Sequence, residues 1–263
     1  MKLRAFENTW HNVNLSILPG GGDSGPAGPE LYRKFYGTLN CCGKNGSPDW
    51  IRRKTAIGQF VAERIFAEWE RHHGRPPRVL ALCVGKCVAE GVWLDQGYAV
   101  TVHECQLDSL SEIRNRYPRA PVVICDIREL EFDQEFDIVT LIASEYFLSR
   151  SELSQFMRTA ASGLSPGGLL IIQSVSILSM RQAVKELVKR LIGHYHKRPY
   201  VFWGYWRTPS EFATTAKSTG LRAVSRYVPR WKADGRIATC HRRRVTSMPP
   251  ISINAEVMVF EKP

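Results

Sequence analysis

Residues 135–174, EFDIVTLIASEYFLSRSELSQFMRTAASGLSPGGLLIIQS, carry the strongest fold signal in this sequence. Two apolar segments, DIVTLIA (137–143) and LLIIQS (169–174), have the length and composition of buried strands. Residues 149–164 between them follow helical spacing and lead into a Ser-Pro-Gly-Gly turn. A strand, a helix and a second strand in this order predict a βαβ unit with two parallel strands.

The same alternation continues upstream of this unit. Strands are expected at residues 78–83, 99–104 and 121–126, and helices at 88–97 and 107–118. Short apolar strands that alternate with helices are typical of doubly wound parallel sheets, whose two faces are covered by helices. The predicted fold class is therefore α/β with a Rossmann-like sheet.

Residues 1–77 precede the first strand and are expected to form an N-terminal helical extension to a domain at 78–263. The clearest element of the extension is a helix over residues 49–74, which Asp49 is expected to cap. Residues 18–29, LPGGGDSGPAGP, contain too much Gly and Pro for regular structure and predict a loop.

The composition indicates a globular protein in a reducing compartment. Of the 263 residues 44% are hydrophobic, yet no apolar run reaches the ~18–20 residues that a membrane-spanning helix needs. The first residues, MKLRAFENTW, lack the apolar core of a signal peptide. The seven cysteines, an odd number, are expected to be reduced thiols, so a cytoplasmic location without a membrane span is predicted.

Positive charge is concentrated in one part of the sequence. Residues 181–244 hold 16 Lys and Arg against 3 Asp and Glu, whereas residues 1–180 hold 19 against 20. Such a segment attracts anionic partners, either acidic small molecules or nucleic acid, or it is simply a solvated basic surface. Within it, CHRRRV (240–245) is expected to be an exposed basic loop.

Three positions predict a nucleotide-binding site at one edge of the sheet. RVLALCVGKC (78–87) places Gly85 after the first strand, where glycine lets the backbone approach a ligand closely. Glu104 ends the second strand, 19 residues after Gly85, and can accept hydrogen bonds from both hydroxyls of a ribose. Asp126 ends the third strand and can face an adenine amino group.

In this order and spacing, residues 78–175 resemble the class I S-adenosylmethionine-dependent methyltransferases. Residues 208–228 are similar to the last helix and sixth strand of that family, and NAEVMVFEKP (254–263) to its terminal antiparallel strand. The resemblance implies a seven-stranded sheet, mostly parallel with the last strand antiparallel, and a biosynthetic enzyme that uses S-adenosylmethionine. It places the cofactor against eight residues that follow the first four strands: Cys83, Val84, Gly85, Glu104, Cys105, Asp126, Ile127 and Ala143.

The loop after the first strand departs from the family pattern, which is an acidic residue followed by G-x-G-x-G. The matching positions hold Ala81, Cys83, Gly85 and Cys87, and the Cβ atom of a cysteine restricts backbone torsions that glycine leaves free. Glu90 is a candidate to replace the acidic residue by contacting the amino group of the methionine part, with a solvated helix position as the alternative.

Three other interpretations of this loop follow from its cysteines and glycine. A loop that has lost its cofactor would make the chain a methyltransferase-like binding protein without catalytic activity. A metal site is disfavoured because the C-x3-C of Cys83 and Cys87 has no second ligand pair at the spacing of a zinc site. A dehydrogenase is disfavoured because G-x-G-x-x-G is absent.

ASEYFLSR (143–150) follows the fourth strand and resembles the acceptor side of methyltransferases that act on small molecules and sugars. The motif N/D/S-P-P-Y/F, expected of enzymes that methylate amino groups of DNA bases, is absent. If the acceptor must lose a proton, the candidates for the general base are Glu145, Tyr146, His194 and His196.

An insert over about residues 179–210 is expected to cover the acceptor as a basic, aromatic lid. In it, Trp203, Tyr205 and Trp206 could stack on a sugar or base, and Arg207 could bind an anionic group. The predicted acceptor is a small or carbohydrate-like molecule methylated at O or N, and the basic charge also suits an anionic one. An RNA methyltransferase is the alternative, because interleaved basic and aromatic residues also bind single-stranded nucleic acid.

Overall fold

The computed structural model describes residues 7–10, 47–105, 107–175, 177, 180–197, 201–234, 236–244 and 256–263. The loop expected at residues 18–29 lies outside these ranges, as does most of the N-terminal extension. The division of the chain at residue 78 therefore stays a prediction.

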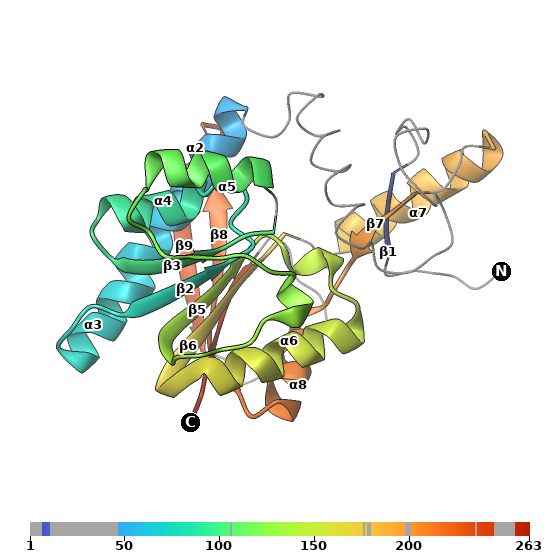
Figure 1. The fold of residues 1–263 in the computed structure, drawn as a ribbon. Coiled ribbons are helices and arrows are strands. Elements are labelled where there is room, and N and C mark those ends of the chain that lie inside the picture. Colours follow the sequence, from blue (N-terminus) through green and yellow to red (C-terminus); the bar gives the residue numbers. More distant parts are fainter. Residues whose placement is uncertain are drawn as a thin grey trace.

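In the described part of the chain, the core is an eight-stranded sheet in the order β4-β3-β2-β5-β6-β10-β8-β9 (Figure 1). Strand β10 (Glu256–Glu261) lies antiparallel between β6 and β8 (Arg222–Trp231). The other strands up to β6 run parallel: β4 (Val122–Val123), β3 (Ala99–His103), β2 (Arg78–Leu82), β5 (Phe136–Ile142) and β6 (Leu164–Ser174). The Rossmann-like fold with an antiparallel C-terminal strand is thus confirmed.

The sheet has one strand more than the seven expected, because β8 and β9 (Ile237–Arg244) form an antiparallel hairpin. Residues 240–244 belong to β9, so the prediction of a loop at CHRRRV was wrong, although His241 and Arg242 are exposed as expected. The amide of Lys232 donates to the carbonyl of Arg236 at 2.8 Å and closes the turn between the two strands. The basic residues of this segment therefore lie along a sheet edge, where charge opposes unwanted strand pairing.

Alternate residues of β2 point into two different cores. Val79 and Ala81 face a core shared with α2 (Pro48–Val61), α4 (Val88–Asp95) and α5 (Leu107–Arg116). Leu80 and Leu82 face a core shared with α6 (Arg150–Gly163) and α8 (Pro209–Ser218). The molecule therefore has three layers, with helices on both faces of the sheet (Figure 1).

The helix expected over residues 49–74 is a continuous run of α2, a π-helical turn (Ala62–Phe66) and α3 (Ala67–His73), after which Gly74 is left-handed. The cap differs from the prediction. The hydroxyl of Ser47 accepts a hydrogen bond from the amide of Trp50 at 3.3 Å, whereas Asp49 forms an ion pair with Arg52. Ser47 caps the helix because it alone stands just outside the first turn.

A glycine contact fixes α2 against α4. A Cβ atom on Gly58 would lie 2.3 Å from the carbonyl oxygen of Ala89, so only glycine permits this approach. The indole N–H of Trp93 donates to the carbonyl of Gly58 at 2.8 Å. Because α4 begins directly after Cys87, this packing also positions the loop that follows β2.

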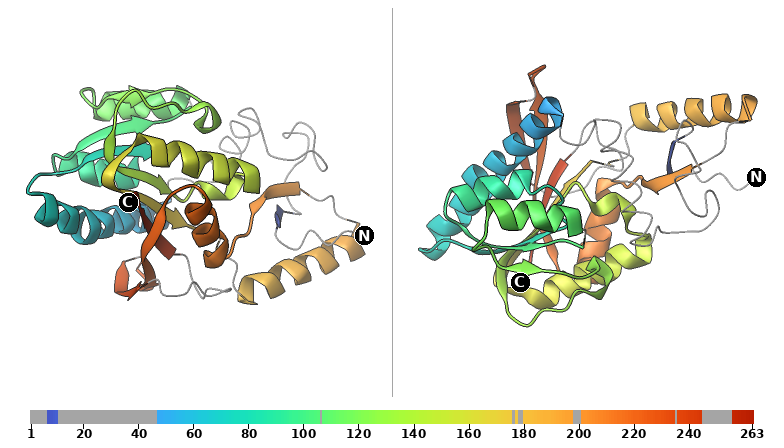
Figure 2. Two further views of the ribbon diagram at one scale, coloured as in Figure 1. Left: turned by 90° about the horizontal axis from the view of Figure 1, so that it is seen from below. Right: turned by 45° about the horizontal axis from the view of Figure 1, so that its top comes forward.

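The segment expected to form a lid contains a helix and a strand. Helix α7 (Met180–Tyr195) follows β6 and extends away from the sheet, as both views in Figure 2 show. Strand β7 (Val201–Tyr205) pairs antiparallel with β1 (Glu7–Trp10) in a separate two-stranded sheet. Since β6 leads into α7, this outlying part lies at the carboxyl end of the parallel strands.

Candidate functional site

The loop after β2 has the backbone of a glycine loop although two of its residues are cysteines. Cys83, Gly85 and Cys87 have φ angles of 52°, 55° and 51°, all left-handed. This conformation costs a residue with a side chain about 1–2 kcal/mol. The three positions are those of the glycines in G-x-G-x-G, so the loop keeps the glycine geometry despite the Cβ atoms.

Hydrogen bonds from two neighbouring strands hold this loop. The carboxylate of Glu104 accepts from the amide of Gly85 at 2.6 Å and from the amide of Cys105 at 2.9 Å. The hydroxyl of Ser144, after β5, donates to the carbonyl of Cys83 at 3.3 Å. These bonds stabilise the strained backbone, which is typical of strain at functional sites.

His103 also supports the loop and was not predicted from the sequence. Its Nδ1 accepts from the amide of Cys83 at 3.3 Å, and the side chain is fully buried. Burial lowers the pKa of His103 to about 4, against weaker opposing hydrogen bonds, so the ring is neutral at physiological pH and can accept. The sequence did contain a signal for this role, because His103 is a polar residue at the end of the apolar strand β3.

The eight residues predicted to contact the cofactor all lie at the carboxyl ends of β2, β3, β4 and β5. Glu104 and Ile127 are buried, and Ala143 after β5 is left-handed with φ 57°. Asp126 accepts hydrogen bonds from the amide and Nε of Arg128 at 2.9 and 2.8 Å. Its bonds to the Arg128 side chain lower the pKa of Asp126.

Glu90 is not the solvated helix residue that was the alternative for it, because it is only 3% exposed. Burial raises its pKa to about 7, although the charge of Lys54 opposes this. Lys54 lies on α2, and its ammonium donates to the carbonyl of Ile142 at the end of β5, at 3.2 Å. Burial lowers the pKa of Lys54, while the charges of Glu90 and Glu145 oppose that change. The charges of Lys54 on α2 and Glu90 on α4 therefore influence each other across these two packed helices.

Lys54 is a site residue that sequence reasoning missed. It stands in line with Trp50, Val61 and Ile65 on the apolar stripe of its helix, at spacings of four, seven and four residues. A lysine on an apolar stripe could have indicated a site residue, because a buried ammonium group needs a partner.

Glu90→Gln is expected to raise stability at pH 8 by about 1–2 kcal/mol, with no gain at pH 4. The folded-state pKa of Glu90, about 7, lies above its ordinary value of 4.5, so wild-type stability falls as pH rises between these values. Lys54, Glu104 and Cys87 are the titratable groups that interact with it, and the remaining Lys54 keeps the gain below the full shift. Urea unfolding at both pH values measures this; a loss at pH 8 would show that the pair with Lys54 is net stabilising.

The loop cysteines are protonated thiols. Burial, and then the charge of Glu104, raises the pKa of Cys83 far above its usual value. Burial likewise raises the pKa of Cys105 to about 11 and that of Cys87 further. Because the thiolate is the reactive form of cysteine, these side chains are poor nucleophiles and fill space in the loop.

Cys83→Val is expected to cost about 2 kcal/mol of unfolding free energy, because a β-branched residue tolerates left-handed torsions worst. Cys83→Gly is the matched control, and it should stay within about 1 kcal/mol of wild type since glycine adopts this backbone freely. Urea denaturation of the three proteins compares them. Equal stability of the Val and Gly variants would mean that the loop relaxes out of the left-handed conformation.

Glu145 and Tyr146 lie next to the loop, in a 3-10 turn (Glu145–Phe147) after β5. Glu145 is fully buried, and its Oε1 accepts from the hydroxyl of Ser174 at 2.5 Å and from the amide of Val175 at 3.1 Å. Burial, and then the charges of Glu145 and Cys83, raise the pKa of Tyr146 well above its usual value. Tyr146 is therefore a hydrogen-bond donor at physiological pH.

The structure does not bring the two candidate histidines to this place. His194 and His196 are exposed at the end of α7, which extends away from the sheet (Figure 2). Trp203 lies in β7, and only its backbone is described. Trp206 and Arg207 are buried, with exposed fractions of 8% and 1%, so they are packed inside the molecule.

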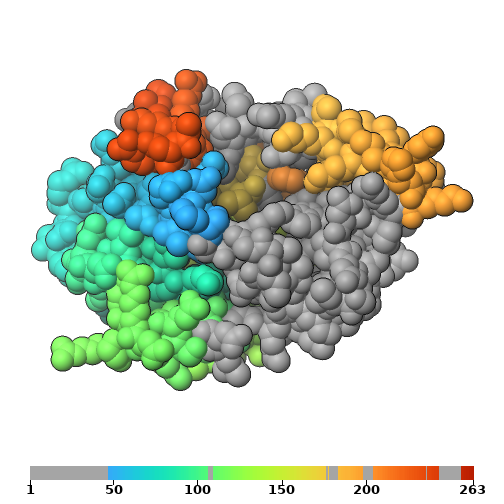
Figure 3. All heavy atoms as spheres, turned by 90° about the horizontal axis from the view of Figure 1, so that it is seen from above, coloured from blue at the N-terminus to red at the C-terminus, as the bar shows by residue number. Residues whose placement is uncertain are grey.

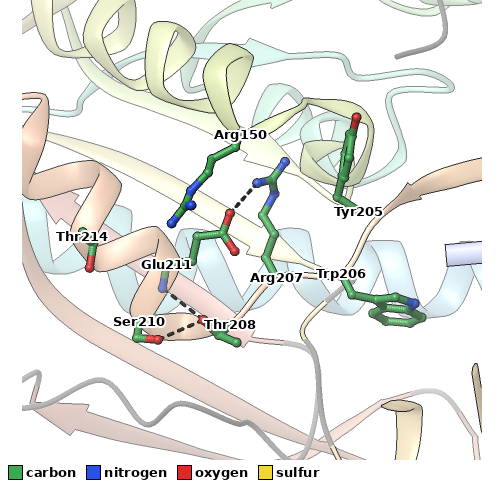
Figure 4. Close-up of a pocket in the computed structure, with 8 residues that line it drawn as sticks. All are labelled: Arg150, Tyr205, Trp206, Arg207, Thr208, Ser210, Glu211 and Thr214. Carbon is green, nitrogen blue, oxygen red and sulfur yellow. Dashed lines mark hydrogen bonds and ion pairs between the residues drawn. The ribbon is translucent and has the colours of Figure 1, made fainter. Parts of the chain in front are cut away.

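Tyr205, Trp206 and Arg207 line an open pocket of about 470 Å³ (Figure 4). The Arg207 guanidinium donates to a Glu211 carboxylate oxygen at 2.9 Å and also to the carbonyl of Leu148. Its charge is therefore paired internally, whereas Arg150 at the start of α6 is exposed beside Glu211. The complete lining is Arg150, Tyr205, Trp206, Arg207, Thr208, Ser210, Glu211 and Thr214.

Much of the basic charge on β8 and the hairpin that follows it is paired with carboxylates. Four arginines of this region form ion pairs with Glu261, Glu256, Asp234 and Glu68; they are Arg222, Arg226, Arg236 and Arg242. The pairing reduces the positive field that an RNA-binding surface needs. None of the described helices is long and apolar enough to cross a bilayer. In the same residues no cluster of His, Cys, Asp and Glu is arranged to hold a metal ion.

A Rossmann-like sheet with β10 inserted antiparallel, a loop of glycine geometry after β2 and an acidic residue ending β3 define the class I S-adenosylmethionine-dependent methyltransferases. Residues 81–172 match the family model of a methyltransferase domain. The described residues therefore have the fold of this class, and residues 81–172 have the sequence pattern of a methyltransferase domain. No curated protein matches the sequence significantly.

Solved structures with the same fold share little sequence with this chain. The 1,6-didemethyltoxoflavin-N1-methyltransferase of Burkholderia thailandensis is 18% identical with a TM-score of 0.56, covering 92% of this chain and 93% of its own. CalS10, an amino pentose methyltransferase of Micromonospora echinaspora, is 14% identical with a TM-score of 0.54, covering 92% and 100%. The magnesium protoporphyrin IX methyltransferase of Synechocystis PCC 6803 is 10% identical with a TM-score of 0.57, covering 82% and 86%. At these identities the likeness shows the fold.

Proposed function

We propose that the protein transfers the methyl group of S-adenosylmethionine to an O or N atom of a small or carbohydrate-like acceptor, neutral or anionic. The observation that carries the proposal is the left-handed backbone at Cys83, Gly85 and Cys87, bonded to Glu104. A loop that had lost its ligand would have no reason to keep three strained positions. The structure therefore supports a working loop over a binding protein without activity.

The described residues fit the parts of the cofactor. Glu104 is proposed to accept from the ribose hydroxyls, and the loop backbone from Cys83 to Gly85 to line the methionine part. Lys54 is proposed to pair with the carboxylate of the methionine part, and Glu90 with its amino group. Glu90 would then replace the acidic residue of the family pattern, at whose position this chain has Ala81. When bound, the cofactor supplies an electrophilic methyl group on a sulfonium. The contribution of the protein is to align the acceptor and to exclude water.

Among the described residues, the candidates for a general base favour a nitrogen acceptor. Glu145 is fully buried and bonded to Ser174 and Val175, so we assign it a positioning role. Tyr146 keeps its proton because its pKa is raised. A neutral amine can attack through its lone pair and lose a proton afterwards, whereas a hydroxyl needs a base as it attacks. Tyr146 is proposed to donate a hydrogen bond to the acceptor.

Calorimetric titration with S-adenosylmethionine and S-adenosylhomocysteine is the first test. Micromolar dissociation constants are expected for both, and no binding at millimolar cofactor would contradict the proposal. Transfer of a labelled methyl group is then compared between amino sugars and the matching sugars that carry a hydroxyl in place of the amino group, which tests the acceptor atom. We expect methylation of the amines, with a rate that rises with pH as the amine loses its proton.

The free thiols of the five described cysteines support the proposal of a cytoplasmic location. They are Cys83, Cys87, Cys105, Cys125 and Cys240.

A further inference from the structure

Helix α7 exposes a row of apolar side chains to solvent. Of the nine large hydrophobic residues exposed in the described part of the chain, six lie on this one helix. Their exposed fractions run from 45% to 82%, and they are Val184, Leu187, Val188, Leu191, Ile192 and Tyr195. At 3.6 residues per turn these six fall within an arc of roughly 140°. They form one continuous apolar stripe along the helix.

The orientation of α7 is the reverse of that of an ordinary amphipathic surface helix. Glu186 and Gly193, on the opposite side from the stripe, are buried, and Glu186 is only 3% exposed. The polar side of the helix thus faces the protein, while the apolar side faces outward. Figure 3 shows α7 as a protruding edge of the molecule, so its outer side is accessible to a large partner. A stripe of this kind marks an interaction surface.

The charges around the stripe select the partner. Lys185 and Lys189 are exposed along one border of the stripe. The Lys189 ammonium is paired with the buried Glu186 at 3.2 Å, so Lys185 is the cation that can reach past the stripe. Residues 180–197, which contain the helix, hold five Lys and Arg against one Glu. A second copy of this chain would bring two such basic borders together, which is unfavourable. An anionic lipid bilayer accepts both the apolar stripe and the cations.

Tyr195 gives a further argument for a bilayer. It stands at the end of the stripe with 82% of its surface exposed, the largest fraction among these residues. A tyrosine ring combines an apolar body with a polar hydroxyl and is favoured at the boundary between lipid and water. We propose that α7 docks on the surface of an anionic lipid bilayer, with its stripe in the headgroup region and its axis parallel to the membrane.

Docking would attach the molecule to the lipid through the helix that follows β6, on the side of the carboxyl ends of the parallel strands. The site of the proposed methyl transfer lies at the same ends. The membrane docking does not depend on that function, since it can be measured without cofactor or acceptor.

Co-sedimentation of the full chain with lipid vesicles tests this proposal. Binding is expected to vesicles of phosphatidylcholine with phosphatidylglycerol, and to weaken at least about tenfold with phosphatidylcholine alone or at high salt. The double variant Leu187→Gln and Leu191→Gln, which leaves the charge unchanged, should also bind at least about tenfold more weakly. The variant Lys185→Gln should lose affinity for the anionic vesicles only.

Ile51→Gln is the matched control, because Ile51 on α2 is 42% exposed and lies outside the stripe. Its binding should stay within about twofold of wild type, and circular dichroism should show all variants folded, as these side chains are exposed. Three results would overturn the proposal: no sedimentation with anionic vesicles at low salt, equal binding of the leucine variant, or a lipid-free dimer that this variant dissociates in size-exclusion chromatography. The last result would identify a second copy as the partner.

Discussion

Replacing Glu104 with alanine is expected to weaken binding of S-adenosylmethionine by about a hundredfold or more. The carboxylate ends β3, accepts from the amides of Gly85 and Cys105, and is proposed to accept from two ribose hydroxyls. A hydrogen bond to a charged group contributes about 1.5–3 kcal/mol, and two of them exceed a hundredfold in affinity. The loop amide of Gly85 also loses its partner in this variant. Isothermal titration calorimetry measures the change.

The matched control for this variant is Glu112→Ala. Glu112 lies on α5 with a 59% exposed side chain, and its ion pair with Lys86 is long at 3.8 Å. Its affinity for the cofactor should remain within about twofold of wild type because exposed ion pairs contribute little. Thermal unfolding shows whether the Glu104→Ala variant is folded. If the folded variant bound the cofactor as tightly as wild type, the assignment of Glu104 to the ribose would be refuted.

Replacing Asp137 with alanine is expected to lower the free energy of unfolding by about 3 kcal/mol at neutral pH. Asp137, in β5, is fully buried and accepts from Arg75 at 2.7 and 2.9 Å, from the Arg78 amide at 2.8 Å and from the Ser165 hydroxyl at 3.1 Å. It joins the start of β2 to β5 and β6. Alanine would leave the partly buried amide of Arg78 and the guanidinium of Arg75 without this acceptor, which lowers the stability of the folded state.

The effect of Asp137→Ala should depend on pH. Burial alone would raise the pKa of Asp137, but its bonds to Arg75, Arg78 and Ser165 outweigh burial and lower the pKa to about 2. Since this value lies below the ordinary 3.8, the stabilisation is present above pH 3.8 and is lost as pH falls through about 2. The difference between wild type and variant should therefore shrink in acid.

Urea unfolding of Asp49→Ala provides the comparison for this effect. Asp49 forms an ion pair with Arg52 in which both side chains are at least half exposed, so its loss should cost less than about 1 kcal/mol. Equal costs for the Asp49 and Asp137 variants would mean that the buried network does not stabilise the sheet.

The layers of this fold were predictable from the sequence because strands and helices are indicated by patterns of a few neighbouring residues. The apolar runs of β2, β5 and β6 are continuous since these strands are buried on both faces. The positions of Gly85, Glu104 and Asp126 also followed from the sequence, because parallel strands end at one edge of their sheet. Neither conclusion needed a long-range contact.

The predictions that were wrong or missing concern features that depend on contacts between residues far apart in the sequence. Residues 240–244 have no apolar pattern, yet they belong to β9 because β8 offers them a free edge. Lys54 meets Glu90 only after α2 packs on α4 at Gly58, which is 31 residues before Ala89 in the sequence. The exposure of His194 and His196 depends on the direction in which α7 leaves the sheet, and no local pattern encodes that direction.

The loop after β2 shows both contributions together. Its sequence shows cysteine at two glycine positions and predicts a backbone that resists the left-handed conformation. The folded chain nonetheless holds Cys83 and Cys87 at positive φ, with Glu104, His103 and Ser144 bonded around them. A local propensity of about 1–2 kcal/mol per residue is outweighed by several tertiary hydrogen bonds. The sequence therefore determined which residues stand in the loop. The packing of three strands around the loop decided the left-handed backbone torsions of Cys83 and Cys87.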